Sequence, residues 1–411
     1  MTCEISKRTI LTIICLAEIL SMLTLATVPA LLPTFILEWS LTKTEAGWIS
    51  GTYYLGYLAA VPFLVSLTDR RPVKPIYFCS LLLSGISAIS FAYFADGIWT
   101  ALVLRTLGGI GLAGTYMPGL KLLTDLLDRI DPNADHSRIV AFYTSSFGVG
   151  VALSYLLTGE ISNFWGWNIT FIILGAGPII ALVFLFFALP PEQFSAHKKP
   201  QTHLLDFRPV FRCKPAVGYI LAYTVHNFEL FAFRSWIVAY LGFAVTLHPG
   251  EDLLITASAI TAISTLVGLP ASVLGNELAQ LIGRHKAITL IMWTSSAVAV
   301  GLGLMAEAPL WALTFMTIVY GILLTGDSSS ITAGTVAEAP IGYKGATLAV
   351  HSCIGFFGSF LGPLVFGLAL DIASSTSIGS TTAESWSWAF NISAIVAATG
   401  PVILYFLRAR G

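Results

Sequence analysis

The chain has 411 residues, of which 56% are hydrophobic and 10% charged, and its mean hydropathy is +0.81. Soluble domains carry about 25% charged residues, so this composition excludes an ordinary soluble enzyme or binding module. The net charge of −1 carries little information, and no polybasic tail or patch in the sequence suggests a nucleic-acid partner.

Twelve apolar segments follow one another along the chain, each near or above the length of about 20 residues that a membrane-spanning helix needs. The predicted helices cover residues 9–37, 46–67, 75–95, 98–122, 138–160, 168–189, 215–242, 253–275, 286–306, 309–332, 346–371 and 385–407. The first is too long for a signal-peptide core of about 7–15 residues, so we interpret it as a membrane helix.

The longest polar stretch lies in the middle of the chain, at residues 190–214. It predicts a cytoplasmic linker between an N-terminal six-helix bundle (1–189) and a C-terminal six-helix bundle (215–411). Six helices, a linker and six helices indicate an internal duplication, as in transporters built from repeats.

Basic residues occupy alternate gaps between the apolar segments. Eighteen of the 21 lie at the termini or in the gaps of one side: Lys7, Arg8, Arg70, Arg71, Lys74, Lys121, Arg129, Arg138, Lys198, Lys199, Arg208, Arg212, Lys214, Arg284, Lys286, Lys344, Arg408 and Arg410. The opposite gaps hold only Lys43, and Arg105 and Arg234 lie inside apolar segments. Since basic residues stay on the cytoplasmic side, the pattern predicts a protein of the inner (cytoplasmic) membrane with both termini in the cytoplasm.

Tryptophan marks the other side of the same topology, because indole rings favour the membrane interface. The tryptophans that map to the outer ends of the predicted helices are Trp39, Trp48, Trp99, Trp165, Trp167, Trp236, Trp311, Trp386 and Trp388. Only Trp293 maps near the inner side.

The five cysteines show no CxxC spacing, so we expect neither a metal centre nor a cofactor.

Two cytoplasmic loops at equivalent positions of the two halves carry an acidic–basic motif. The loop after the second helix reads SLTDRRPVKPIY, and the loop after the eighth reads GNELAQLIGRHK. The fourth helix contains RTLGGIGLAGTYMP, with Arg105, Gly109, Gly111 and Ala113 in a fixed spacing. Together these motifs resemble those of the major facilitator superfamily. Val65 and Pro72 replace glycines of the family loop, and Gln280 and Leu281 replace the Asp–Arg pair in its second copy.

The resemblance implies an all-α membrane protein in which twelve transmembrane helices form two pseudo-symmetric six-helix bundles. It also implies that helices 1, 4, 7 and 10 line a central cavity. The segments HNFELFAFRSWIVAYL, DSSSITAG and ATLAVHS are similar to a branch of bacterial permeases related to nitrate and cyanate transporters.

The cytoplasmic loops suggest gating residues. Asp69 can pair with basic groups of a neighbouring helix and latch the cytoplasmic side closed, with Arg70 and Arg284 as basic members of the two loops. The alternative is that these basic residues only enforce topology. Asp327 and His351 fall toward the cytoplasmic ends of helices 10 and 11, where packing or gating is the expected role.

Ionisable residues inside apolar helices are costly and usually face a cavity, a partner or a pathway. The candidate substrate-binding residues are Arg105, His226, Asn227, Glu229 and Arg234, and the candidate proton-coupling residues are Glu18, His226 and Glu229. His226 and Glu229 are three residues apart and share one helix face. The alternatives are interhelical salt bridges for Glu229 and Arg234, a structural hydrogen-bonding role for Arg105, and an outward-reaching side chain for Arg234.

These observations predict a secondary active transporter that moves a small polar solute, most simply an anion, by alternating access and with proton coupling. It is expected to act as a monomer in the lipid bilayer, with a small-molecule solute and protons or another coupling ion as partners. No GxxxxGK[ST] loop or nucleophile–base set occurs in the sequence, so neither an ATP-driven pump nor an enzyme is expected. The alternatives are a proton-driven exporter of amphipathic or cationic compounds and a membrane sensor that does not transport.

Overall fold

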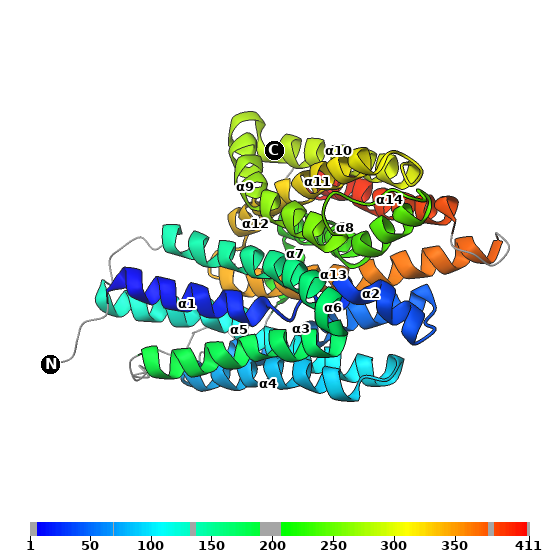
Figure 1. Cartoon of the computed structure of the whole chain (residues 1–411). Helices are drawn as coiled ribbons and strands as arrows, with labels where there is room; N and C mark the ends of the chain where they lie inside the picture. The colour runs from blue at the N-terminus through cyan, green and yellow to red at the C-terminus, as the bar shows by residue number, and fades with distance from the viewer. Residues whose placement is uncertain (1–5, 69, 132–136, 190–206, 377–381, 409–411) are drawn as a thin grey trace. The chain divides into compact units, whose positions relative to one another are not determined.

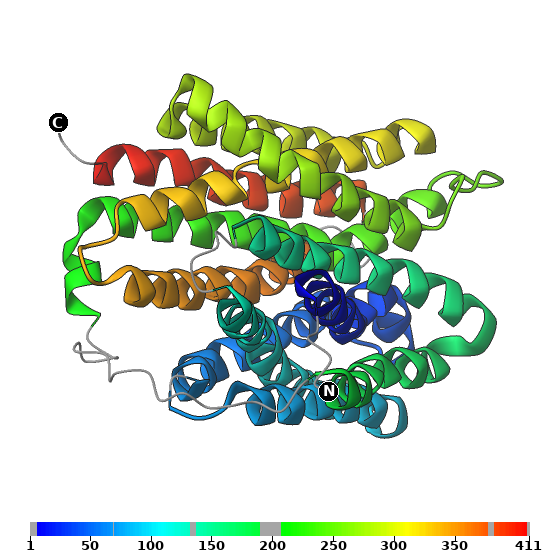
Figure 2. The same ribbon diagram turned by 90° about the vertical axis from the view of Figure 1, so that its left-hand side faces the viewer.

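The computed structural model describes residues 6–68, 70–131, 137–189, 207–376 and 382–408. These residues form fourteen helices, drawn in Figures 1 and 2. Their bounds are α1 Lys7–Met22, α2 Thr27–Glu38, α3 Lys43–Thr68, α4 Val73–Phe94, α5 Ile98–Ile130, α6 Ser137–Ala188, α7 Arg208–Arg212, α8 Lys214–Thr246, α9 Ala257–Ile282, α10 Arg284–Leu304, α11 Leu310–Gly326, α12 Ser328–Ala337, α13 Lys344–Thr376 and α14 Ala383–Leu407.

In the described part of the chain, eleven helical stretches are long and apolar enough to cross a membrane. One of them is α6, whose 52 residues would extend about 78 Å, more than twice a bilayer core of about 30 Å. Gly166 interrupts α6 with φ 76° and ψ 170°, and there the chain turns back on itself (Figure 2). Counted as two spans, α6 brings the total to the predicted twelve, so the chain is an all-α multi-pass membrane protein.

Two of the predicted helices are interrupted, which the sequence did not indicate. The first predicted helix is divided into α1 and α2 by the segment 23–26, and the tenth into α11 and α12 at Asp327. Neither interruption contains a proline. Each one leaves main-chain groups without their helical partners, so other groups must bind them.

The helices fold into two compact units, Met1–Thr27 with Leu55–Lys199 and Val28–Tyr54 with Pro200–Gly411. In the first, α1, α4, α5 and α6 bury an apolar core that includes Tyr77 and Tyr143. In the second, α8 contacts α9, α11, α12, α13 and α14 and is buried along most of its length. The segment Val28–Tyr54 groups with the residues after the linker, and the predicted division into 1–189 and 215–411 stays a prediction.

Glycines bring α13 against α8 in the second unit. A Cβ atom on Gly358 would lie 2.1 Å from the main-chain oxygen of Thr224, and one on Gly362 would lie 2.2 Å from that of Phe228. Small residues allow such close approach of membrane helices. The glycine-rich run 355–363 therefore packs one helix backbone directly on another.

We predict that Gly362→Ala destabilises the protein, because the added methyl group meets main-chain atoms that cannot turn away. The expected loss in the free energy of unfolding is about 1–3 kcal/mol. Gly301→Ala in α10 is the matched control, since nothing lies within 4 Å of a Cβ there, and it should be neutral or stabilising by up to about 1 kcal/mol. Equal thermal unfolding midpoints for the two variants in detergent would contradict this packing.

Candidate functional site

Helix α8 carries four of the predicted site residues, and all four are buried. His226, Asn227, Glu229 and Arg234 are between 2% and 9% exposed. At about 100° per residue, His226 and Glu229 lie about 60° apart, whereas Asn227 and Arg234 lie about 80–100° round the helix on the other flank. The helix therefore presents two adjacent polar faces.

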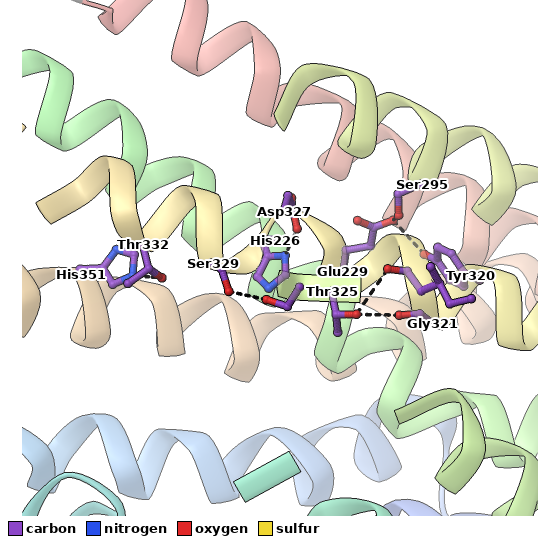
Figure 3. Close-up of polar contacts among 12 residues, drawn as sticks. His226, Glu229, Ser295, Tyr320, Gly321, Thr325, Asp327, Ser329, Thr332 and His351 are labelled. Atoms are coloured by element: carbon purple, nitrogen blue, oxygen red, sulfur yellow. Dashed lines mark hydrogen bonds and ion pairs between the residues drawn. The ribbon is translucent and has the colours of Figure 1, made fainter. Parts of the chain in front are cut away.

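The first face pairs His226 with Asp327. Nδ1 of His226 lies 2.8 Å from Oδ1 of Asp327, at the interruption between α11 and α12 (Figure 3). Both side chains are almost fully buried. A neutral imidazole can donate its Nδ1 proton to the carboxylate and keep Nε2 as an acceptor, and a protonated one forms an ion pair. The contact therefore places an imidazole and a carboxylate side by side inside the helix bundle.

Glu229 lies one helical turn further along the same face. Its Oε1 accepts hydrogen bonds from Ser295 Oγ of α10 at 2.8 Å and from Tyr320 Oη of α11 at 2.9 Å (Figure 3). Both donors are uncharged hydroxyl groups, and Glu229 as a whole is 3% exposed. The surroundings thus provide hydrogen bonds from hydroxyl groups, which can bind either the neutral or the charged carboxyl group.

The line of titratable groups continues toward α13. Tyr223 stacks between His226 and His351, with ring centroids 5.7 and 3.9 Å away. Nδ1 of His351 lies 3.1 Å from Thr335 Oγ1, and Thr335 donates its one hydroxyl proton to the Ile331 carbonyl. The threonine oxygen therefore accepts from Nδ1–H, which assigns the tautomer of a neutral His351.

We call Glu229, His226, Asp327 and His351 the polar row. Figure 3 shows them following one another along α8, α11, α12 and α13. All four are buried. The row brings together residues that the sequence analysis assigned separately to proton coupling and to gating.

The second face of α8 combines a cation with aromatic rings. The Arg234 guanidinium lies 5.5 Å from the Phe231 ring centroid. Phe231, Tyr54 and Phe356 form a triangle with centroid distances of 4.4, 6.2 and 6.3 Å. Asn227 lies beside the Tyr223 ring, where both would meet a Cβ atom on Gly355. This face can offer a positive charge, an amide and π surfaces to a solute.

In the first unit, Glu18 of α1 is fully buried. Tyr143 Oη lies 2.9 Å from Glu18 Oε2 and 2.8 Å from the main-chain oxygen of Tyr116. A hydroxyl group has one proton, so it cannot donate to both acceptors at once. Both contacts of Tyr143 can be hydrogen bonds at once when Glu18 is protonated and donates to Tyr143, which then donates to Tyr116.

Arg105 reaches the interruption between α1 and α2. Its terminal nitrogens lie 3.5 Å from the oxygen of Thr24 and 3.3 Å from that of Leu25. Ser154 bridges the same interruption: its Oγ donates to the oxygen of Leu23 and accepts from the amide of Ala26. Arg105 therefore contacts main-chain oxygens, the hydrogen-bonding role that the sequence left open beside anion binding.

The predicted gating residues are less informative. Asp69 lies outside the described residues, Arg70 is exposed, and Arg284 is the half-buried first residue of α10.

The sequence did not indicate a role for Ser154, Ser295 or Tyr320, because one hydroxyl group in an apolar helix gives no distinctive signal.

Two tryptophans differ from the interfacial placement expected of them. Trp236 is fully buried and donates its Nε1–H to the Pro363 oxygen at 2.9 Å, and Trp386 is 3% exposed. Both pack in an aromatic cluster with Phe366. Their positions along the chain were compatible with the interface, but their side chains turn inward to the helix contacts.

Comparison with known proteins places these features in a family. The family model of the Major Facilitator Superfamily matches residues 14–248. The niacin transporter NiaP of Acinetobacter baylyi is 25% identical over 155 residues, covering 38% of this chain and 34% of that protein. The uncharacterized MFS-type transporter YybF of Bacillus subtilis is 29% identical over 174 residues, covering 42% and 41%. The chain thus matches between about a third and a half of the length of the first curated relatives.

Solved structures show the same fold over nearly the whole chain. A bacterial homolog of the human lysosomal transporter Spinster, in an inward-facing and unoccupied conformation, superposes with a TM-score of 0.75 at 15% identity and covers 98% of this chain and 95% of its own. The nucleoside transporter NupG superposes with a TM-score of 0.77 at 14% identity, covering 98% and 100%. Since the family model matches more than half of the sequence, the chain belongs to the Major Facilitator Superfamily of membrane transporters.

Proposed function

We propose that the chain is a secondary active transporter that moves a small organic anion together with protons by alternating access. We place it in the inner (cytoplasmic) membrane with both termini in the cytoplasm, as the distribution of basic residues predicts. The observation that carries the proposal is the polar row, a line of buried titratable side chains that packing alone does not require.

The proton is assigned to the face of α8 that holds His226 and Glu229. Asp327 Oδ1 lies 2.8 Å from Nδ1 of His226, so a proton taken up by the imidazole would have a carboxylate beside it. Glu229 is bound by two hydroxyl groups, which can accompany either protonation state. Glu18 in the first unit, with Tyr143 beside it, is the second candidate for proton binding.

The solute is assigned to the face of α8 that holds Arg234 and Asn227. Arginine stays charged in any environment and binds carboxylates with two parallel donors. The aromatic triangle beside it favours a planar ring. The similarity to a niacin transporter supports a carboxylate on a ring as the first solute to test. Arg105 is a weaker candidate for an anion ligand, because it already contacts two main-chain oxygens.

The rival function is a proton-driven exporter of amphipathic or cationic compounds. Three buried acidic residues, Glu18, Glu229 and Asp327, favour it over an anion carrier on charge alone. In the structure each of the three contacts a hydroxyl group or a histidine, which is the environment we assign to proton binding. Displacement of a bound probe by a hydrophobic cation, and not by small acids, would favour the exporter.

The proton assignment predicts that Glu229→Gln and His226→Gln uncouple transport. Solute-driven proton movement into proteoliposomes should fall to that of protein-free vesicles, because the titratable group is gone. Exchange of labelled for unlabelled solute should persist, since exchange needs no net proton movement. The two rates are followed with a pH-sensitive dye and a radiolabelled solute.

Glu307→Gln is the matched control, because Glu307 is exposed between α10 and α11 and its loss should leave proton movement unchanged. Undiminished proton movement in both the Glu229 and the His226 variants would remove this assignment.

The anion assignment predicts a difference between matched pairs of acid and amide. Niacin and benzoate should bind, and nicotinamide and benzamide, which have the same rings without the charge, should bind far more weakly. Arg234→Gln should weaken acid binding by about tenfold to a hundredfold, the range for a hydrogen bond to a charged group. Competition against a labelled acid in detergent measures both effects.

Arg212→Gln, at an exposed arginine of α7, should change nothing. If the amides bind as tightly as the acids, or if Arg234→Gln weakens both equally, the solute is not recognised through its charge at Arg234.

A further inference from the structure

A carboxylate near the end of α13 holds the beginning of α3. Asp371 Oδ1 accepts a hydrogen bond from the amide of Lys43 at 3.0 Å. Its Oδ2 accepts from the amide and the hydroxyl group of Thr44, at 2.7 and 2.6 Å. These amides open α3, where a helix leaves donors unsatisfied and favours a negative charge.

The start of α3 already has a local cap, so the hydrogen bonds to Asp371 are not needed to begin the helix. Glu45 Oε2 accepts from the amide of Thr42, and the amide of Glu45 donates to Thr42 Oγ1, at 2.8 and 3.2 Å. This reciprocal pair is a capping box. Since it can start the helix by itself, the hydrogen bonds to Asp371 chiefly join two segments that are more than 300 residues apart.

The two helices fit closely beyond this contact. A Cβ atom on Gly47 would lie 2.5 Å from the oxygen of Pro363, and one on Gly51 would lie 2.5 Å from that of Phe360. On α13, a Cβ atom on Gly367 would lie 2.2 Å from the oxygen of Lys43. Backbone meets backbone along this contact, and Asp371 supplies charge-assisted hydrogen bonds at its end.

The contact has a particular place in the chain. α3 is one continuous helix, yet its first part, up to Tyr54, belongs to the compact unit that contains α13, and the rest, from Leu55, belongs to the other unit. The contact with α13 therefore holds the first part of a helix whose remainder belongs to the other unit.

We propose that Asp371 is the outer latch of the transport cycle: its carboxylate holds the first turns of α3 on α13 while the outer side is closed, and releases them when that side opens. The proposal rests on alternating access and on the predicted topology, which places Lys43 on the outer side. It does not depend on the nature of the solute or of the coupling ion. The latch that the sequence predicted, at Asp69, follows the last residue of α3 in the sequence and lies outside the described residues.

The test measures access from outside to a buried position on α3. Ser50 is fully buried in the first part of α3, so Ser50→Cys in a background without other cysteines should react slowly with a membrane-impermeant maleimide added outside. Asp371→Ala should speed this reaction by about fivefold, the factor that corresponds to the free energy contributed by a helix cap. Asp371→Asn keeps one acceptor oxygen and should give an intermediate rate.

Glu384→Ala is the control, because Glu384 is an exposed carboxylate in the first turn of α14, and it should leave labelling unchanged. Each variant is first checked for an unchanged elution volume and unfolding midpoint, so that faster labelling cannot come from unfolding. If Asp371→Ala is folded and labels at the original rate, Asp371 is not a latch. Because labelling needs no solute, this outcome is distinct from a failure of the proposed anion transport.

Discussion

In the apolar interior of this protein, every charge and every free main-chain group must find a partner within the bundle, since lipid offers none. Two helices are interrupted, and each interruption lies beside a buried charged residue. Arg105 and Ser154 bind the main chain between α1 and α2, and Asp327 stands between α11 and α12, where it contacts His226. At each of these two interruptions, a break in regular helical hydrogen bonding coincides with a buried ionisable side chain.

This constraint gives α8 its central position. One face meets α10 and α11 through Glu229, and it meets Asp327 through His226. On the other face, Phe231 contacts Phe356 of α13 and Tyr54, at the end of the first part of α3. A proton on the first face and a solute on the second would act on the same rigid helix. Coupling between the two ligands then needs no direct contact, only a difference in how each favours the alternative positions of α8.

Much of the fold could be predicted from the sequence because its signals are repeated many times. Hydropathy predicted the twelve spans, and the motifs around Arg70 and Arg105 predicted the superfamily, both of which are confirmed. The shared face of His226 and Glu229 followed from helical spacing alone. The hydrogen-bond partners of the buried carboxyl groups could not be predicted from the sequence. These partners are the single hydroxyl groups of Ser295, Tyr320 and Tyr143, whose depth and rotation depend on how the helices pack. The two helix interruptions could not be predicted either, because neither contains a proline.

The central claim is that solute and proton binding are linked through α8. Linkage is reciprocal, so solute binding must change the number of bound protons. Isothermal titration of solute into the purified protein, in buffers of different ionisation enthalpy, measures that number directly. Over a range from about pH 5 to 8, we expect an exchange of about one proton per solute, and its loss in His226→Gln. An enthalpy that is the same in every buffer across this range would contradict the account.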